Sequence, residues 1–195
     1  MMKIPYGRQF IDNDDIKEVS KVLKNEFITT GKQVSKFEQK INNLLKCKFS
    51  SACNSGTSAL LLAFQSIGLK KNDVVVMPSV TFIASYNVVK LLGAKVFLAD
   101  VNRITGQMSP NDILNCCKKF KIKKIKAIVT MYNGGYPENA GSFFKLKKKL
   151  GCYVIEDACH AFGARYFFEG KKNYIGSCKH SDLCTFSFHP LKTIT

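Results

Sequence analysis

The final nine residues of the chain, SFHPLKTIT (187–195), place a lysine shortly after an apolar run. The run at residues 182–188 has the composition of a core strand, and Lys192 follows it. A lysine near a partly buried strand end can have a lowered pKa and can act as an amine nucleophile toward an aldehyde. Because the chain has 30 Lys and Arg residues, an ordinary surface position is the alternative for Lys192.

A second candidate lies in the stretch VIEDACHA (154–161), where Glu156 and Asp157 close another apolar run. Burying a carboxylate is costly unless it meets a cation or a strong hydrogen-bond donor. His160 follows Asp157 by three residues. The two residues could serve a ligand, and a salt-bridged acid beside a structural histidine explains the same pattern.

Two further stretches favour ligand contacts. Gly56 and Thr57, in NSGTSAL (54–60), predict a helix start with free backbone N–H groups and the positive end of the helix dipole, which suits a phosphate. An ordinary N-cap explains this stretch too. Phe82, in MPSVTFIASYN (77–87), is predicted one turn into the next helix, where it could stack on a flat ligand or belong to the core. Ser187 adds a hydroxyl after the last apolar run.

The elements that must position these residues alternate between apolar runs and helices. The runs are at residues 50–54, 73–78, 94–100, 125–131, 151–158 and 182–188. The helices are predicted at residues 12–25, 31–46, 58–69, 82–93, 109–120 and 142–151. Continuous apolar runs indicate strands covered on both faces, and their alternation with helices predicts an α/β fold with a mostly parallel sheet. In such sheets ligands bind at the carboxyl ends of the strands, where the candidate residues fall.

Taken together, these residues match the groups that bind pyridoxal 5′-phosphate. Its phosphate requires a helix N-terminus, its ring a stacking partner and its aldehyde a lysine. Its pyridine nitrogen requires an acid that keeps it protonated, so that the ring acts as an electron sink. The sequence therefore predicts a cofactor site at one edge of the sheet.

The same stretches carry a family resemblance. NSGTSAL, MPSVTFIASYNVV, GAKVFLADV, VIEDACHAFGARY, IGSCKHSD and TFSFHPLKTIT resemble the DegT/StrS-type sugar aminotransferases, pyridoxal-phosphate enzymes of fold type I. The ending is most similar to members that aminate C4 of nucleotide-linked 4-keto-6-deoxy sugars, as in the pseudaminic-acid pathway. The resemblance implies transamination in polysaccharide or glycan sugar biosynthesis, with glutamate as amino donor.

The resemblance also assigns roles. It implies that Lys192 is the Schiff-base lysine and that Asp157 is the partner of the pyridinium nitrogen. His160 and Phe82 would lie against the two faces of the ring. The phosphate would be bound by Gly56, Thr57 and Ser187.

One stretch departs from the family pattern. Many members carry a His-aromatic-x-Gly motif after the fourth strand, whereas MYNGGYPEN (131–139) has Met131 in the histidine position. The family places this loop near the substrate, so the departure leaves the exact sugar open.

The resemblance implies a longer protein and a homodimer. We expect residues 1–48 to form an N-terminal helical segment. We expect residues 49–195 to form an incomplete pyridoxal-phosphate-binding large domain of three layers, truncated before its antiparallel strand and the small C-terminal domain. This stretch alone is then expected to be inactive.

Composition argues against other classes of partner. The net charge is +16, yet arginine, the usual base-reading residue, occurs only at Arg8, Arg103 and Arg165, so nucleic-acid binding is not favoured. No apolar run reaches the length of a membrane span, and the N-terminus does not resemble a secretion signal. Eight cysteines without a CxxC pair then fit reduced thiols in a cytoplasmic protein.

Three alternatives remain. A dehydratase relative on the same fold usually has histidine where Lys192 stands, and a non-catalytic relative would not need the full set of site residues. A zinc-binding module is suggested by a run of Cys and His residues, although their spacing lacks the paired knuckles of structural zinc sites, so no metal is predicted. That run comprises Cys159, His160, Cys178, His180, Cys184 and His189.

Overall fold

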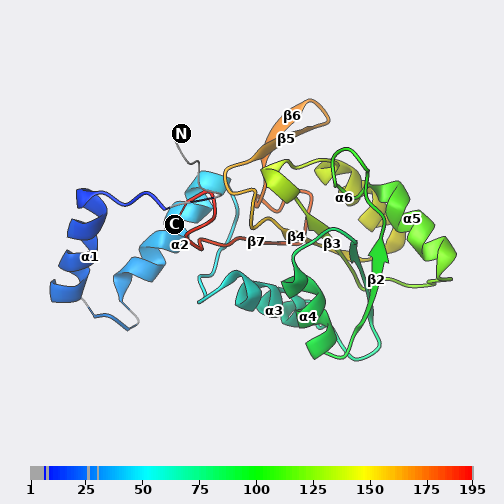
Figure 1. Cartoon of the computed structure of the whole chain (residues 1–195), viewed down its shortest axis with the longest axis horizontal. Helices are drawn as coiled ribbons and strands as arrows, with labels where there is room; N and C mark the ends of the chain where they lie inside the picture. Colours follow the sequence, from blue (N-terminus) through cyan, green and yellow to red (C-terminus); the bar gives the residue numbers. More distant parts are fainter. Residues whose placement is uncertain (1–6, 8, 26, 30, 195) are drawn as a thin grey trace, which may run out of the picture.

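A parallel sheet forms the centre of the protein. The computed structural model describes residues 7, 9–25, 27–29 and 31–194. Within them, five parallel strands run in the order β2-β1-β3-β4-β7 (Figure 1). The strands are β1 (Val74–Pro78), β2 (Lys95–Ala99), β3 (Ala127–Met131), β4 (Tyr153–Asp157) and β7 (Leu183–Thr185). The chain leaves β1 toward β2 and returns to β3 on the other side of β1, which creates a topological switch point where α/β sheets bind ligands.

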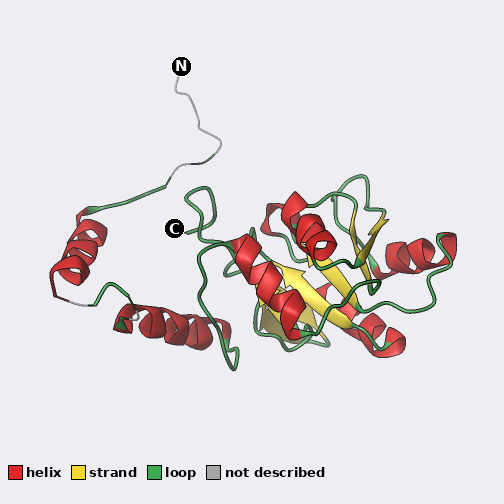
Figure 2. Ribbon diagram, turned by 90° about the horizontal axis from the view of Figure 1, so that it is seen from below, coloured by secondary structure: helices red, strands yellow, loops and turns green. Residues whose placement is uncertain are grey.

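Helices cover both faces of this sheet (Figure 2). Val75 and Met77 of β1 belong to a core formed with α3 (Gly56–Ser66) and α4 (Ile83–Leu91). Val76, between them, belongs to a second core formed with α5 (Pro110–Lys119) and α6 (Ala140–Leu150). Successive strand residues point to opposite faces, so a continuous apolar strand needs both layers. The predicted α/β fold with a mostly parallel sheet is confirmed.

Local sequence signals set the ends of several helices. Ser109 caps α5 and forms a reciprocal capping box with Asp112, and Pro110 occupies the first turn. Ser55 caps α3 by accepting a hydrogen bond from Ser58 N at 3.1 Å. At the end of α6, Gly151 adopts the left-handed conformation, with φ at 62°.

Two helices precede the sheet layers. They are α1 (Asn13–Asn25) and α2 (Lys32–Leu45), and they lie to one side of the sheet (Figure 1). Leu45 is buried, and the ring of Phe37 contacts the ring of Phe188 near the end of the chain, with centroids 5.2 Å apart. The contact between Phe37 and Phe188 attaches α2 to the segment that follows β7.

Four features differ from the sequence prediction. Residues 50–54 form a loop, because Glu38 of α2, and not a neighbouring strand, binds Ser50 and the amide of Ala52.

The strand predicted over 182–188 is shorter, since β7 ends at Thr185. Phe82 precedes the first residue of α4 and does not lie inside the helix.

The fourth difference is an unpredicted hairpin of β5 (Arg165–Phe168) and β6 (Lys171–Tyr174). Its two-residue turn is Glu169-Gly170, and both residues have positive φ values, 49° and 72°. Such turns match the twist of a hairpin and favour glycine. The Glu-Gly pair is thus the signal that could have revealed it.

Candidate active site

A single groove lies at the carboxyl ends of the strands. Its volume is about 1460 Å³. All of the sequence-predicted site residues line it: Gly56, Thr57, Phe82, Asp157, His160, Ser187 and Lys192. Met131, the residue that departs from the family pattern, lines it as well.

Asp157 is the deepest charged group of the groove. It is the last residue of β4 and is only 1% exposed. Ser85 Oγ donates a hydrogen bond to Asp157 Oδ2 at 3.1 Å, and Cys159 N approaches Oδ1 at 3.3 Å. Among the residues the structure describes, no cationic side chain forms an ion pair with Asp157. A buried carboxylate held only by neutral donors favours a ligand that brings a positive charge.

The start of α3 borders two of the predicted site segments. A Cβ atom added at Gly56 would lie 3.2 Å from Ser187 Cβ and 3.3 Å from Cys159 Sγ. Glycine therefore lets the helix start approach the segments after β7 and β4. The first N–H groups of a helix have no partner within it, so those of Gly56 and Thr57 are available to an anion.

Lys192 lies in a turn that begins at Ser187. His189 N approaches Ser187 Oγ at 3.4 Å, and Lys192 N donates to His189 O at 2.7 Å. The Lys192 side chain is partly buried. These local bonds fold the segment back so that Lys192 faces the groove seven residues after β7 ends.

The electrostatics of His160 link it to both charged residues. Burial lowers the pKa of His160, the positive charge of Lys192 lowers it further, and the negative charge of Asp157 opposes them. His160 thus favours the neutral ring, which suits contact with an aromatic ligand. Phe82, by contrast, is 61% exposed at the start of α4, so its ring is open to contact from the groove.

Cys159 packs between these groups as a neutral thiol. Burial raises the pKa of Cys159 strongly, and the nearby Asp157 carboxylate raises it further. Neither Cys159 nor Ser85 was singled out for this site from the sequence. Ser85 carries no local signal, whereas the position of Cys159 two residues after the strand-end acid could have marked it.

A second buried carboxylate stabilises the loops behind the groove. Glu156 precedes Asp157 in β4, so their side chains point to opposite faces of the sheet. Tyr132 Oη donates to Glu156 Oε1 at 2.9 Å, and Gly176 N approaches Oε2 at 3.4 Å. Burial raises the pKa of Glu156, although these hydrogen bonds oppose the effect. Glu156 therefore connects the loop after β3 to the segment after β6.

The residues present fit pyridoxal phosphate. The free N–H groups at the start of α3 suit the phosphate, and the buried Asp157 carboxylate suits a protonated ring nitrogen. Lys192 supplies an amine on the same groove. Within the described residues, no group of three metal-binding side chains converges.

Comparison with known proteins identifies the family. Residues 9–195 match the model of the DegT/DnrJ/EryC1/StrS aminotransferase family. The chain belongs to this family. The predicted family is thereby confirmed, and so is pyridoxal phosphate as the cofactor of this family.

Two curated relatives illustrate the similarity. The chain is 37% identical over 198 residues to the UDP-4-amino-4,6-dideoxy-N-acetyl-beta-L-altrosamine transaminase of Campylobacter jejuni, covering 98% of this chain and 49% of that protein. It is 33% identical over 196 residues to the GDP-perosamine synthase of Escherichia coli O157:H7, covering 100% and 51%. The chain therefore spans about half the length of these relatives.

Solved structures agree with the fold. Helicobacter pylori PseC, an aminotransferase involved in the biosynthesis of pseudoaminic acid, matches with a TM-score of 0.88 and 26% identity, over 100% of this chain and 50% of that one. A Streptococcus pneumoniae protein described as a sugar aminotransferase, in its PLP-form, matches with a TM-score of 0.88 and 25% identity, over 100% and 51%. In the described part of the chain, no helix combines the length and apolar character that a membrane span requires.

Proposed function

We propose that this chain forms the cofactor-binding part of an aminotransferase that acts on a nucleotide-linked keto-sugar, with pyridoxal phosphate as cofactor and glutamate as amino donor. The observation that carries the proposal is the meeting of three features on one groove. These are the buried Asp157 carboxylate, the open start of α3 and the Lys192 amine. A flat, phosphorylated aldehyde with a basic ring nitrogen requires all three at once.

Each residue then has a defined role. Asp157 keeps the ring nitrogen protonated, because its carboxylate is buried and is held by Ser85. Gly56 and Thr57 bind the phosphate through backbone N–H groups, and Ser187 adds its hydroxyl. Neutral His160 and Phe82 would contact the ring of the cofactor.

Lys192 performs the proton transfer. When bound, pyridoxal phosphate supplies an electron sink that makes the carbon bearing the amino group acidic. Once its own amine is free, Lys192 Nζ removes the proton from that carbon and later returns it on the path to product. After it takes up the proton, Lys192 carries a positive charge close to His160. Burial and this charge lower the pKa of His160, so the histidine stays neutral and does not take the proton from Lys192.

The names of two relatives support the proposed substrate class. The Campylobacter jejuni relative is named for a 4-amino-4,6-dideoxy sugar linked to UDP, and the Escherichia coli relative for a GDP-linked amino sugar. A 4-keto-6-deoxy sugar nucleotide is therefore the proposed amino acceptor, and polysaccharide or glycan sugar biosynthesis the proposed pathway. The altered loop at Met131 is expected to affect which sugar is accepted.

The proposal also includes a homodimer. Residues 49–195 would form the cofactor-binding domain, with residues 1–48 as a helical segment that contacts a second copy in a homodimer. In support, α1 exposes Ile16, Val19 and Leu23, each by more than half of its surface. Spaced three and four residues apart, they form one apolar face.

Borohydride trapping tests the proposal directly. The purified chain is incubated with pyridoxal phosphate, reduced with borohydride and digested, and the labelled peptide is mapped. We expect the label on Lys192, and its loss in Lys192→Ala. The control Lys123→Ala removes an exposed lysine outside the groove and should label as the unmodified chain does.

Two outcomes would contradict the assignment. Label spread evenly over many lysines in a chain that circular dichroism shows to be folded would mean that Lys192 is not selective. Equal labelling of Lys192→Ala and the unmodified chain would mean that another residue is the nucleophile.

A further inference from the structure

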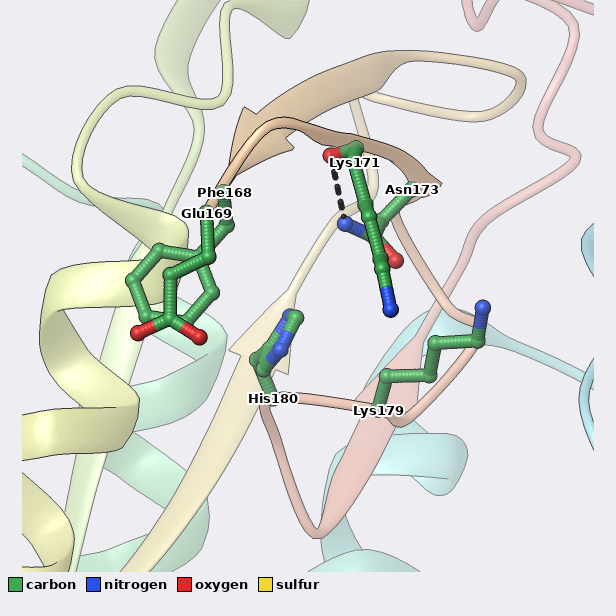
Figure 3. A pocket seen from close by; sticks show the side chains of 6 residues that line it. All are labelled: Phe168, Glu169, Lys171, Asn173, Lys179 and His180. Carbon is green, nitrogen blue, oxygen red and sulfur yellow. Dashed lines mark hydrogen bonds between the residues drawn. The ribbon is translucent and has the colours of Figure 1, made fainter.

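A second pocket lies between the β5–β6 hairpin and the loop that precedes β7 (Figure 3). Its volume is about 330 Å³, at the lower end of the range for small-ligand pockets. Its lining shares no residue with the groove described above. The lining residues are Phe168, Glu169, Lys171, Asn173, Lys179 and His180.

The charges around this pocket do not balance. Two carboxylates are nearby, and lysines of α6 engage both: Glu169 pairs with Lys145 at 3.3 Å, and Asp182 pairs with Lys147. In the described part of the chain, neither Lys171 nor Lys179 forms an ion pair. Two ammonium groups therefore border one small pocket whose lining carboxylate, Glu169, is paired with Lys145. Their repulsion is relieved if an anion binds between them.

The two lysine side chains lie differently: that of Lys171 extends into this space, whereas that of Lys179 extends away from His180 (Figure 3). In Figure 3 the Lys171 side chain extends from the hairpin toward the space between His180 and Lys179. Glu169 points away from that space, beside the ring of Phe168. Asn173, only 4% exposed, donates from Nδ2 to the carbonyl oxygen of Lys171 at 2.9 Å and so holds the backbone of that lysine in place.

His180 adds a third nitrogen. Its Nδ1 is 2.6 Å from Tyr166 Oη, and its ring contacts the rings of Phe144 and Phe168 at centroid distances of 5.1 and 4.6 Å. Burial raises the pKa of Tyr166, so the hydroxyl keeps its proton and can donate it to Nδ1. A neutral ring that accepts at Nδ1 carries its own proton on Nε2. The Nε2–H group is then a donor without a partner in the described part of the chain.

We propose that this pocket binds a phosphate group, held by Lys171, Lys179 and Nε2 of His180. A tetrahedral dianion with several acceptor oxygens satisfies two ammonium groups and a ring N–H together, whereas chloride would satisfy fewer of them. The pocket is too small for a whole nucleotide-linked sugar, which requires a site of the size of the groove. The ligand is therefore free phosphate or the phosphate group of a small metabolite, and this site is independent of the cofactor site.

Calorimetric titration with inorganic phosphate at constant ionic strength tests the site, and glucose 1-phosphate serves as a second probe. Loss of two charge-assisted contacts in Lys171→Ala/Lys179→Ala should weaken phosphate binding by about tenfold or more. The control Lys123→Ala/Lys124→Ala removes the same charge from exposed loop positions and should bind as the unmodified chain does. A second control, Ser187→Ala, removes the hydroxyl that the proposed function assigns to the cofactor phosphate and should leave this phosphate affinity unchanged.

The outcomes separate the explanations. Equal weakening in both lysine pairs would mean diffuse attraction to a basic surface and would overturn the proposal. Loss confined to Ser187→Ala would place the phosphate in the groove instead. If inorganic phosphate and glucose 1-phosphate both bind, the phosphate group is the recognised unit. If only one of them binds, that probe shows whether the ligand is free phosphate or a phosphorylated metabolite.

A measurement on the unmodified chain avoids dependence on the fold of the variants. The ring C–H resonances of the three histidines are followed by NMR as phosphate is added. We expect the His180 resonances to shift and saturate, with His160 and His189 unaffected. An unmoved His180 resonance at saturating phosphate would refute the site.

Discussion

Ser85 Oγ and Asp157 Oδ2 are 3.1 Å apart, and both side chains are almost wholly buried, although 72 residues separate them in the sequence. The bond joins α4 to the end of β4. It fixes one carboxylate oxygen and leaves the second facing Cys159 N and the groove. Ser85 thus orients the carboxylate that the proposed mechanism requires at the ring nitrogen.

The first prediction concerns this pair. Ser85→Ala leaves a buried carboxylate oxygen without its donor, which should lower the free energy of unfolding by about 1 to 3 kcal/mol. It should also weaken the binding of pyridoxal phosphate. A double-mutant cycle with Asp157→Asn, measured by urea unfolding, should give a coupling energy of about 0.5 to 3 kcal/mol. Additive effects of the two changes would show that the hydrogen bond does not contribute.

A second prediction compares two adjacent glycines in the loop after β3. Gly134 and Gly135 both have positive φ values, 67° and 82°. A Cβ at Gly134 would have open space, whereas a Cβ at Gly135 would lie 2.5 Å from the carbonyl oxygen of His160. Gly134→Ala should cost only the left-handed backbone strain, about 1 to 2 kcal/mol. Gly135→Ala should cost more and should weaken cofactor binding, because the segment that carries His160 must move.

Urea unfolding and pyridoxal phosphate absorbance measure the two effects. Gly134→Ala is the matched control, since it has the same strain without the close approach. If the two variants are equally stable and bind the cofactor equally well, the contact between Gly135 and His160 does not constrain the site.

The third prediction concerns the titration of His160. Burial and then the charge of Lys192 lower its pKa below the ordinary value of 6.5. Lys192→Ala should therefore raise the pKa of His160, while burial still keeps it below 6.5. NMR titration of the ring protons measures this change.

The second pocket offers a control, because His180 there is influenced by a different lysine. Burial also lowers the pKa of His180, the negative charge of Glu169 opposes this effect, and the positive charges of Lys179 and Lys148 add to it. Lys179→Ala should raise the pKa of His180 and leave His160 unchanged, whereas Lys192→Ala should do the reverse. If Lys192→Ala left the pKa of His160 in place, the two side chains would not be close in solution.

The fourth prediction concerns Glu156 and pH. Burial raises the pKa of Glu156 above its ordinary value of 4.5, so the folded protein holds this proton more tightly than the unfolded chain does. The contribution of Glu156 to the free energy of unfolding is therefore largest below pH 4.5 and decreases as the pH rises through the folded-state pKa. Glu156→Gln cannot lose a proton, so its stability relative to the unmodified chain should increase over that range. Parallel pH profiles of urea unfolding would refute the raised pKa.

Much of the candidate site could be predicted from the sequence because its signals are local. The position of Asp157 at the end of an apolar run and the glycine and hydroxyl residues at the start of a helix depend on neighbours a few residues away. The carboxyl ends of parallel strands meet at one edge, so these separate signals could be combined into one site. The structure brings all of these residues to one groove, and their roles remain predictions.

Other features depend on residues far apart in the sequence. Ser85 resembles any helix residue until the fold places it against Asp157. Residues 50–54 are predicted to be a strand, yet Glu38 of α2 satisfies part of their hydrogen bonding and they form a loop.

The sequence by itself determined the alternation of helices with the strands of the central sheet and the residues that could do chemistry, because those depend on local composition and periodicity. The resemblance of its motifs indicated the family. Only the tertiary structure decided where β7 ends, which donor holds Asp157, and that Lys171 and Lys179 share a pocket without a carboxylate partner in the described part of the chain. The physical reason is that hydrogen bonding, burial and charge balance are set by neighbours in space, and the chain brings those neighbours together only on folding.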